Sequence, residues 1–297
     1  PTTRNELITQ SCGFAITLRS NREGFNPVFA ITIGNQIDLT VSDCLRAVCM
    51  RDDVDAIGVY MEGFNYLDGL AFVHAVRSAV AAGKQIVFYK AGRTQAGQSA
   101  TAGHTASLAG DYDVCQCAAG QAGAIVVDTF KEFEQVLDLA TAFHHCEVRG
   151  KRIGIVTKAG FAAVGMADAV IGARYALDIP ELSENTKAKI QRVVAQAKLD
   201  RLVNVRNPLD VTPMAGEQVY AESARAFLED DKIDAVIVSV VPFTSELTTT
   251  VEELESARRS LADELPELLK QYNKPLIAVI DAGKMYDPLA LLLRRRG

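Results

Sequence analysis

The sequence predicts an α/β fold of two doubly wound domains with mainly parallel sheets. Short apolar runs of strand length alternate with longer segments of helical periodicity along the chain. The alternation breaks at the polar stretch 144–150 and then restarts. The 297 residues suffice for two domains of ordinary size. We therefore expect one domain over residues 1–148 and a second over residues 149–297.

The first half contains five apolar runs that predict buried strands. These runs are residues 6–10, 28–33, 56–61, 85–89 and 124–127. The helices predicted between and after them are 11–22, 41–50 with Thr40, Ser42 or Asp43 as cap, 67–82, 107–120 and 130–143. In sheets of this kind, ligands bind beyond the carboxyl ends of the strands.

The second half repeats the alternation. Its predicted strands are residues 153–157, 235–241 and 276–280. Its predicted helices are residues 162–172, 183–199, 218–228 and 250–272.

The segment 90–110, KAGRTQAGQSATAGHTASLAG, is the most informative part of the chain. It has no large apolar side chain before Leu108, so we expect a functional loop that cannot bury itself. Lys90 and Arg93 supply positive charge, and the glycines allow close approach to a charged ligand. His104 is its strong nucleophile or general base. Taken alone, these residues fit either a phosphate-handling histidine or a solvated surface histidine.

Composition and charge argue against two classes of function. The net charge of −6 and the lack of a basic strip with interleaved aromatic residues disfavour nucleic-acid binding. No apolar run approaches the roughly 18 residues that span a bilayer, and no signal peptide is present. We expect a cytoplasmic protein with neither a nucleic acid nor a membrane as partner.

The cysteines predict reduced thiols and no metal site. Cys115 and Cys117 are one residue closer than the C-x-x-C spacing of zinc and redox sites, and the sequence has no matching pair. A chain of this size has enough core without disulfides. The other four cysteines are Cys12, Cys44, Cys49 and Cys146.

Four separated motifs resemble those of the NDP-forming acyl-CoA synthetases, relatives of succinyl-CoA ligase. The phosphohistidine loop of that family, G-R-T…S-H-T-G-S-L-A-G, is similar to GRT at 92–94 and GHTASLAG at 103–110. The family's G-N-x-x-D, Y-x-E-G and N-P-x-D are similar to GNQID at 34–38, YMEG at 60–63 and NPLD at 207–210. In this order, the motifs extend the resemblance over nearly the whole chain.

The resemblance implies two flavodoxin-like, succinyl-CoA ligase-like domains and an acid–thiol ligase activity. In it, His104 takes phosphate from an acyl phosphate made from acyl-CoA and passes it to a nucleoside diphosphate, or the reverse. A neutral imidazole is a competent nucleophile near pH 7, which suits this relay. By the family pattern, Glu62 holds the second ring nitrogen of His104 and fixes its tautomer.

The resemblance also implies a phosphate site made from two helix starts. One is the turn 11–13, in the place of the family's Q-S-G-G-type turn; the other is the turn 158–160, in the place of T-N-x-G-G-P. Helix N-termini bind anions, and the added phosphoryl group carries about two negative charges. The implied phosphate-binding residues are Ser11, Cys12, Gly13, Gly103, Thr105, Lys158, Ala159 and Gly160.

The sequence departs from the family pattern at four positions. They are Cys12 for Gly, Ala106 for Gly, Lys158 for Asn and Phe161 for Gly. Because His104 and Glu62 are retained, the enzyme is the preferred interpretation. The alternative is a non-catalytic regulatory or scaffold module, similar to the ligase-like half of certain protein acetyltransferases; the altered Phe161 turn favours it.

The resemblance further implies a larger assembly. The family's CoA-binding domain normally precedes this region and its ATP-grasp domain normally follows, and the 297 residues contain neither. We expect an excised piece or a subunit, inactive alone, that acts in an oligomer with these domains as partners. No cofactor is expected to bind within this chain. CoA, ATP or ADP and magnesium would act in the complete enzyme on a small carboxylic acid.

Overall fold

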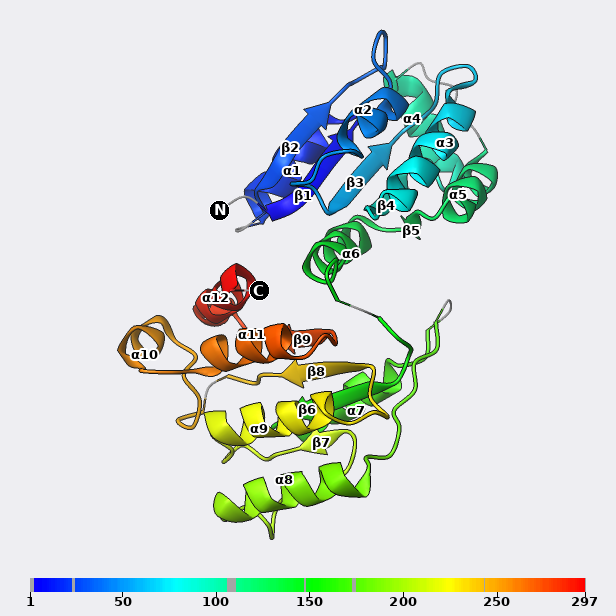
Figure 1. Cartoon of the computed structure of the whole chain (residues 1–297). Coiled ribbons are helices and arrows are strands. Elements are labelled where there is room, and N and C mark those ends of the chain that lie inside the picture. Colours follow the sequence, from blue (N-terminus) through cyan, green and yellow to red (C-terminus); the bar gives the residue numbers. More distant parts are fainter. Residues whose placement is uncertain are drawn as a thin grey trace. The chain divides into compact units, whose positions relative to one another are not determined.

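The chain forms two compact units, Pro1–His145 and Cys146–Gly297 (Figure 1). The computed structural model describes residues 3–22, 25–105, 111–146, 148–172, 175–242 and 244–296, with the backbone alone for residues 102–105. Each unit is built around a parallel sheet. The predicted α/β class with parallel sheets is therefore confirmed.

The first unit contains a five-stranded parallel sheet in the order β2-β1-β3-β4-β5. This order is that of the flavodoxin-like doubly wound sheet. The strands are β1 (Thr3–Thr9), β2 (Pro27–Thr32), β3 (Ala56–Met61), β4 (Gln85–Lys90) and β5 (Ile125–Val127). The helices are α1 (Cys12–Asn21), α2 (Val41–Val48), α3 (Asp68–Ala81), α4 (Gln95–Thr105), α5 (Tyr112–Gln121) and α6 (Phe130–Ala142).

Separate apolar clusters cover the two faces of this sheet. Successive strand residues point to opposite faces, so Leu7 and Ile8 of β1 enter different clusters. Ile8 shares a cluster with Phe72 of α3, whereas Leu7 shares one with Leu18 of α1 and Phe133 of α6. Burial on both faces explains why the strands read as continuous apolar runs.

The second unit contains a four-stranded parallel sheet in the order β7-β6-β8-β9. The strands are β6 (Ile153–Thr157), β7 (Leu209–Asp210), β8 (Ala235–Ser239) and β9 (Leu276–Val279). The helices are α7 (Gly160–Asp168), α8 (Glu184–Gln196), α9 (Glu217–Leu228), α10 (Val251–Ser256), α11 (Leu261–Gln271) and α12 (Asp287–Arg296), with a short 3-10 turn η1 (Lys284–Tyr286). One cluster joins the four strands to α8, α9, α11 and α12.

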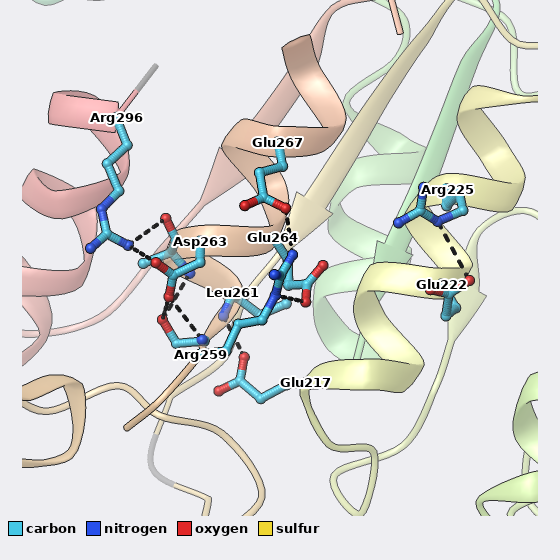
Figure 2. Close-up of polar contacts among 11 residues, drawn as sticks. Glu217, Glu222, Arg225, Arg259, Leu261, Asp263, Glu264, Glu267 and Arg296 are labelled. Atoms are coloured by element: carbon cyan, nitrogen blue, oxygen red, sulfur yellow. Dashed lines mark hydrogen bonds and ion pairs between the residues drawn. The ribbon is translucent and has the colours of Figure 1, made fainter. Parts of the chain in front are cut away.

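Polar contacts fix the start of α11 (Figure 2). The Glu217 carboxylate, in the first turn of α9, accepts a hydrogen bond from the Leu261 N–H at 2.5 Å. Arg259, just before α11, pairs with Glu264 and Glu267 of that helix. Because Glu217 is largely buried, its pKa is raised, and its hydrogen bonds oppose that shift.

The prediction of a loop over the segment 90–110 is wrong for residues 95–105, because they form α4 (Gln95–Thr105). The hydroxyl of Thr94 accepts a hydrogen bond from the Gly97 N–H at 3.1 Å, as an N-cap does. Gln and Ala, frequent in this segment, are good helix formers. Of residues 95–101, Thr101 alone is buried, so the segment lacks the apolar stripe that predicts a helix.

Two further boundaries correct the prediction. The helix predicted over 107–120 is α5 (Tyr112–Gln121), because the Asp111 side chain caps it by accepting from the N–H groups of Asp113 and Val114. The single helix predicted over 250–272 is two helices, α10 and α11. The backbone is extended at Ala257, and Ser260 starts a new capping box.

Candidate functional site

Three buried polar side chains lie at the carboxyl edge of the first sheet. They are Gln10 after β1, Glu62 after β3 and Lys90 at the end of β4. The register aligns Thr9 with Tyr60 and Met61 with Lys90, so these side chains leave adjacent strands at the same edge. This is the edge at which doubly wound sheets bind ligands.

Glu62 is held at its backbone and at its carboxylate. Its N–H donates to Gln10 Oε1 at 2.6 Å, and its carbonyl oxygen accepts from Lys90 Nζ at 2.8 Å. Its Oε1 accepts from the Tyr60 hydroxyl at 3.1 Å. Burial and the neighbouring Glu62 carboxylate raise the pKa of Tyr60, which keeps the hydroxyl protonated as a donor. Glu62 itself is 7% exposed, so its carboxylate is buried next to the Tyr60 hydroxyl.

Lys90 does not present its charge at the surface, contrary to our expectation. Its side chain is 2% exposed, and Nζ donates to the carbonyl oxygens of Glu62 and Ala91. Burial lowers the pKa of Lys90. Arg93, by contrast, is exposed on the segment that leads into α4.

The predicted nucleophile lies near the end of α4. The backbone of Gly103, His104 and Thr105 belongs to this helix, and their side chains lie outside the described residues, as does all of 106–110. The contact between His104 and Glu62 therefore stays a prediction. The segment 91–105 continues from β4, which pairs with β3, the strand that Glu62 directly follows.

The predicted turn 11–13 is the start of α1. Ser11 is the N-cap: its Oγ accepts from the Phe14 N–H at 3.2 Å, and its own N–H donates to Thr9 Oγ1 at 2.9 Å. Cys12 is the first helical residue and is an exposed free thiol. The N–H groups of a first helical turn lack intrahelical acceptors, so Cys12 and Gly13 supply donors suited to an anion.

The predicted turn 158–160 is likewise the start of α7. Ala159 is its N-cap, and the Ala159 N–H donates to Thr157 Oγ1 at 3.3 Å, as Ser11 does to Thr9. Lys158 is 1% exposed, and its Nζ donates to Thr244 Oγ1. Its ammonium is thus directed into the second unit.

Two neighbours of the α7 start bear on its use as an anion site. Phe161, which stands where the family pattern has Gly, is 73% exposed. A Cβ at Gly160 would lie 3.5 Å from Asp210 Oδ2, so a carboxylate lies beside this helix start. The helix begins at Gly160, two residues before the predicted start at 162.

Two of the remaining motif residues have structural roles. Asn207 accepts from the Ile155 N–H and donates to the carbonyl oxygens of Ile153 and Pro180, which ties the chain before β7 to β6. Gln36 has a positive φ of 55°, donates to the Gly63 carbonyl at 2.9 Å and accepts from the Val41 N–H at 3.0 Å. The GNQID motif therefore supports the turn that follows Glu62.

All six cysteines are free. Within the described ranges, no group of three or more His, Cys, Asp or Glu residues could hold a metal ion. In those same ranges, no helix has the length and apolar character needed to cross a membrane.

Comparison with known proteins confirms the resemblance seen in the motifs. Residues 4–142 match the family described as Succinyl-CoA ligase like flavodoxin domain. The chain is 29% identical over 296 residues to the subunit alpha of acetate–CoA ligase (ADP-forming) II of Pyrococcus furiosus, covering 98% of this chain and 60% of that protein. It is 31% identical over 266 residues to acetate–CoA ligase (ADP-forming) II of Archaeoglobus fulgidus, covering 88% of this chain and 35% of that protein.

A solved structure has the same fold. It is the dinucleotide forming acetyl-coenzyme A synthetase 1 of Ca. Korarchaeum cryptofilum in complex with phosphate and ADP, with a TM-score of 0.81 and 22% identity. The match covers 99% of this chain and 60% of that one. The chain therefore spans about 60% of the length of the Pyrococcus relative and of this structure.

Proposed function

We propose, from a first unit that belongs to the succinyl-CoA ligase-like flavodoxin family, that the chain is the phosphate-relaying part of an NDP-forming acyl-CoA ligase. The observation that carries the proposal is the buried Glu62, whose carboxylate accepts from the Tyr60 hydroxyl and whose backbone is bonded to the side chains of Gln10 and Lys90. A fixed carboxylate is what a catalytic histidine needs to hold one tautomer. The similarity to ADP-forming acetate–CoA ligases supports the same assignment.

The proposed relay has two phosphoryl transfers. A ring nitrogen of His104 attacks the phosphorus of an acyl phosphate, the P–O bond to the acyl group breaks, and the carboxylate leaves. A terminal oxygen of a nucleoside diphosphate then attacks the same phosphorus, the P–N bond breaks, and neutral His104 returns. The Glu62 carboxylate accepts a hydrogen bond from the N–H of the other ring nitrogen, which stabilises the positive charge that the phosphorylated ring develops.

The charge of the phosphoryl group would be met by helix starts. The N–H groups of Cys12 and Gly13 at the start of α1 are the donors proposed in the first unit, with Gly103 and Thr105 beside the histidine. In the second unit the start of α7 would offer the Gly160 N–H to an anion, because the Ala159 N–H is bonded to Thr157 and the ammonium of Lys158 to Thr244.

The proposed activity needs domains other than the two units described. The chain covers 60% of the Pyrococcus relative and 35% of the Archaeoglobus relative, which fits a part of a larger enzyme. We propose CoA-binding and ATP-grasp domains or subunits as its partners, in an oligomer. They would bring CoA, the nucleotide and magnesium to His104, with a small carboxylic acid as substrate.

Incubation of the complete enzyme with [γ-32P]ATP tests the proposal. We expect protein-bound label that is acid-labile and base-stable, and that disappears in His104→Ala. The matched control is His74→Ala, which removes an exposed histidine of α3 and should keep the label. Label that survives in His104→Ala would overturn the assignment. A wild-type enzyme without label would favour the non-catalytic scaffold instead.

A further inference from the structure

The carboxyl edge of the first sheet holds a buried cation that the proposed relay does not use. Lys90 is 2% exposed, and its Nζ lies 2.8 Å from the Glu62 carbonyl oxygen and 2.7 Å from that of Ala91. A buried ammonium costs free energy that an apolar side chain would not. The contacts of Lys90 therefore point to a role that needs a donor at this position.

The ladder of backbone hydrogen bonds ends where these side chains begin. The last bonds on the two sides of β3 join the Gln10 N–H to the Tyr60 carbonyl and the Ala91 N–H to the Met61 carbonyl. The next residue, Glu62, has its N–H bonded to the Gln10 side chain and its carbonyl bonded to the Lys90 side chain. Side chains thus continue the ladder by one residue beyond the strand.

These side-chain hydrogen bonds hold the two peptide groups on either side of the Glu62 Cα, from which the carboxylate side chain extends. Gln10 Oε1 also accepts from the Gly63 N–H at 3.0 Å. The N–H groups of Glu62 and Gly63 therefore share the same acceptor atom. Without Lys90, the peptide group between Glu62 and Gly63 would lose its partner on the β4 side and would be held by Gln10 alone. A change of about 1 Å in a catalytic group can cost on the order of 100-fold in rate.

We propose that Lys90 is a positioning residue that fixes Glu62 through its main-chain carbonyl, and so sets the orientation in which Glu62 meets His104. This inference rests on the proposed function. It assigns Lys90 to the geometry of the relay, and not to contact with the phosphoryl group or the nucleotide.

The substitution Lys90→Met tests this role because it keeps the length of the side chain and removes the donor. In the complete enzyme, we expect the rate of His104 phosphorylation from [γ-32P]ATP to fall about 10- to 100-fold, as for other residues that orient a functional ligand. The ATP concentration that gives half the maximal rate should stay unchanged, because Lys90 does not touch the nucleotide.

A double-substitution cycle separates positioning from general destabilisation. If Lys90 acts through Glu62, then Lys90→Met should change the rate less than about 3-fold in a Glu62→Gln background, because coupled residues are non-additive. An equal effect of Lys90→Met in both backgrounds would overturn the inference.

Lys84 provides the matched control. Its Nζ also donates to two main-chain carbonyls, those of Arg51 and Val54, but at the opposite end of β4. Lys84→Met should therefore lower the thermal unfolding midpoint without slowing phosphorylation. If it slows phosphorylation as much as Lys90→Met does, loss of stability explains both effects and the inference fails.

Two outcomes remain to be separated. If Lys90→Met does not fold, Lys90→Gln enters the same cycle; failure of both to fold would assign Lys90 to folding and overturn the inference. Label that persists in His104→Ala would refute the phosphate relay itself. Loss of label in His104→Ala together with additive effects of Lys90→Met and Glu62→Gln would refute only the role of Lys90.

Discussion

Arg152 and Asp234 form a bidentate ion pair where β6 and β8 begin, with Nε–Oδ2 and Nη2–Oδ1 distances of 2.9 and 2.7 Å. The first unit has the same arrangement between Arg4 and Asp55, at 2.6 and 2.8 Å. Each aspartate directly precedes a central strand, and its N–H donates to the arginine carbonyl at 2.7 Å. The two units therefore repeat one framework.

This repeat predicts the effect of removing Asp234. Asp234→Ala takes away three hydrogen bonds to Arg152, one of them to its backbone N–H, and should lower the free energy of unfolding by about 2–3 kcal/mol. The hydrogen bond from Arg152 lowers the pKa of Asp234 below the usual aspartate value of 3.8. The ionised Asp234 therefore stabilises the fold at pH values above 3.8, and this stabilisation is lost as the pH falls through the lowered pKa. Urea unfolding at pH 7 measures the loss. The neighbouring exposed Asp231→Ala should change stability by less than about 0.5 kcal/mol.

The burial of Glu6 predicts that stability is lost as the pH rises toward about 8. It is fully buried in β1, neither carboxylate oxygen has a hydrogen-bond partner among the described residues, and burial raises its pKa to about 8. Arg51 opposes this shift and Asp53 adds to it. The folded state therefore retains a proton that the unfolded state releases near pH 4.5. Stability should fall as the pH rises from about 4.5 to about 8 and then level off.

The substitution Glu6→Gln checks this sign. It should raise the urea midpoint of the first unit at pH 9 relative to the unsubstituted protein, and should give little or no gain at pH 5. As a control, Glu255→Gln, at an exposed position of α10, should leave the urea midpoints at pH 5 and at pH 9 unchanged. A Glu6→Gln protein with the same pH dependence as the parent would show that Glu6 is not the group responsible.

The hydrogen bonds of Asn207 predict that its substitution costs more stability than the same substitution at the nearby Asn204. Asn207→Asp loses a donor shared by two carbonyl oxygens and places a carboxylate against them, so it should cost about 2–3 kcal/mol of stability. Asn204→Asp makes the same chemical change at an exposed position nearby and should cost little. Thermal unfolding of both variants gives the comparison; equal losses would contradict the pinning role of Asn207.

The capping role of Ser11 predicts that its substitution lowers stability and also slows phosphorylation of His104. Ser11→Ala removes the cap of α1 and should cost about 1 kcal/mol. It should also slow His104 phosphorylation, because the proposed phosphate donors, Cys12 and Gly13, are in the turn that this cap orders. Ser183→Ala removes the corresponding cap of α8 and should cost a similar free energy without slowing phosphorylation.

The sheets could be predicted from the sequence because their strands are buried on both faces. The apolar runs 56–61 and 153–157 coincide with β3 and β6, since every residue of these two strands is buried. The start of α4 lacks such a signal, because its helix formers carry almost no buried side chain. The break between α10 and α11 did have a signal in the capping boxes at Thr250–Glu253 and Ser260–Asp263.

The position of Glu62 could be predicted from the sequence for the same reason, because it directly follows a buried parallel strand. Gln10 was not predicted as a site residue, although it follows the neighbouring strand at the same edge. The contact of Tyr60 with Glu62 had a usable signal, because residues two apart in a strand share a face. The contact of Lys90 with a main-chain carbonyl had none, since it depends on how the strand ends are aligned. His104 stays a prediction, with its side chain outside the described residues.

A pulse–chase measurement on the phosphorylated enzyme tests the central claim most directly. The complete enzyme is first labelled with [γ-32P]ATP and freed of nucleotide, then mixed rapidly with unlabelled ADP. A relay through His104 predicts that the label returns to ATP at a rate no slower than turnover, and that Glu62→Gln slows this transfer. Label that remains on the protein, or leaves more slowly than the enzyme turns over, would contradict it.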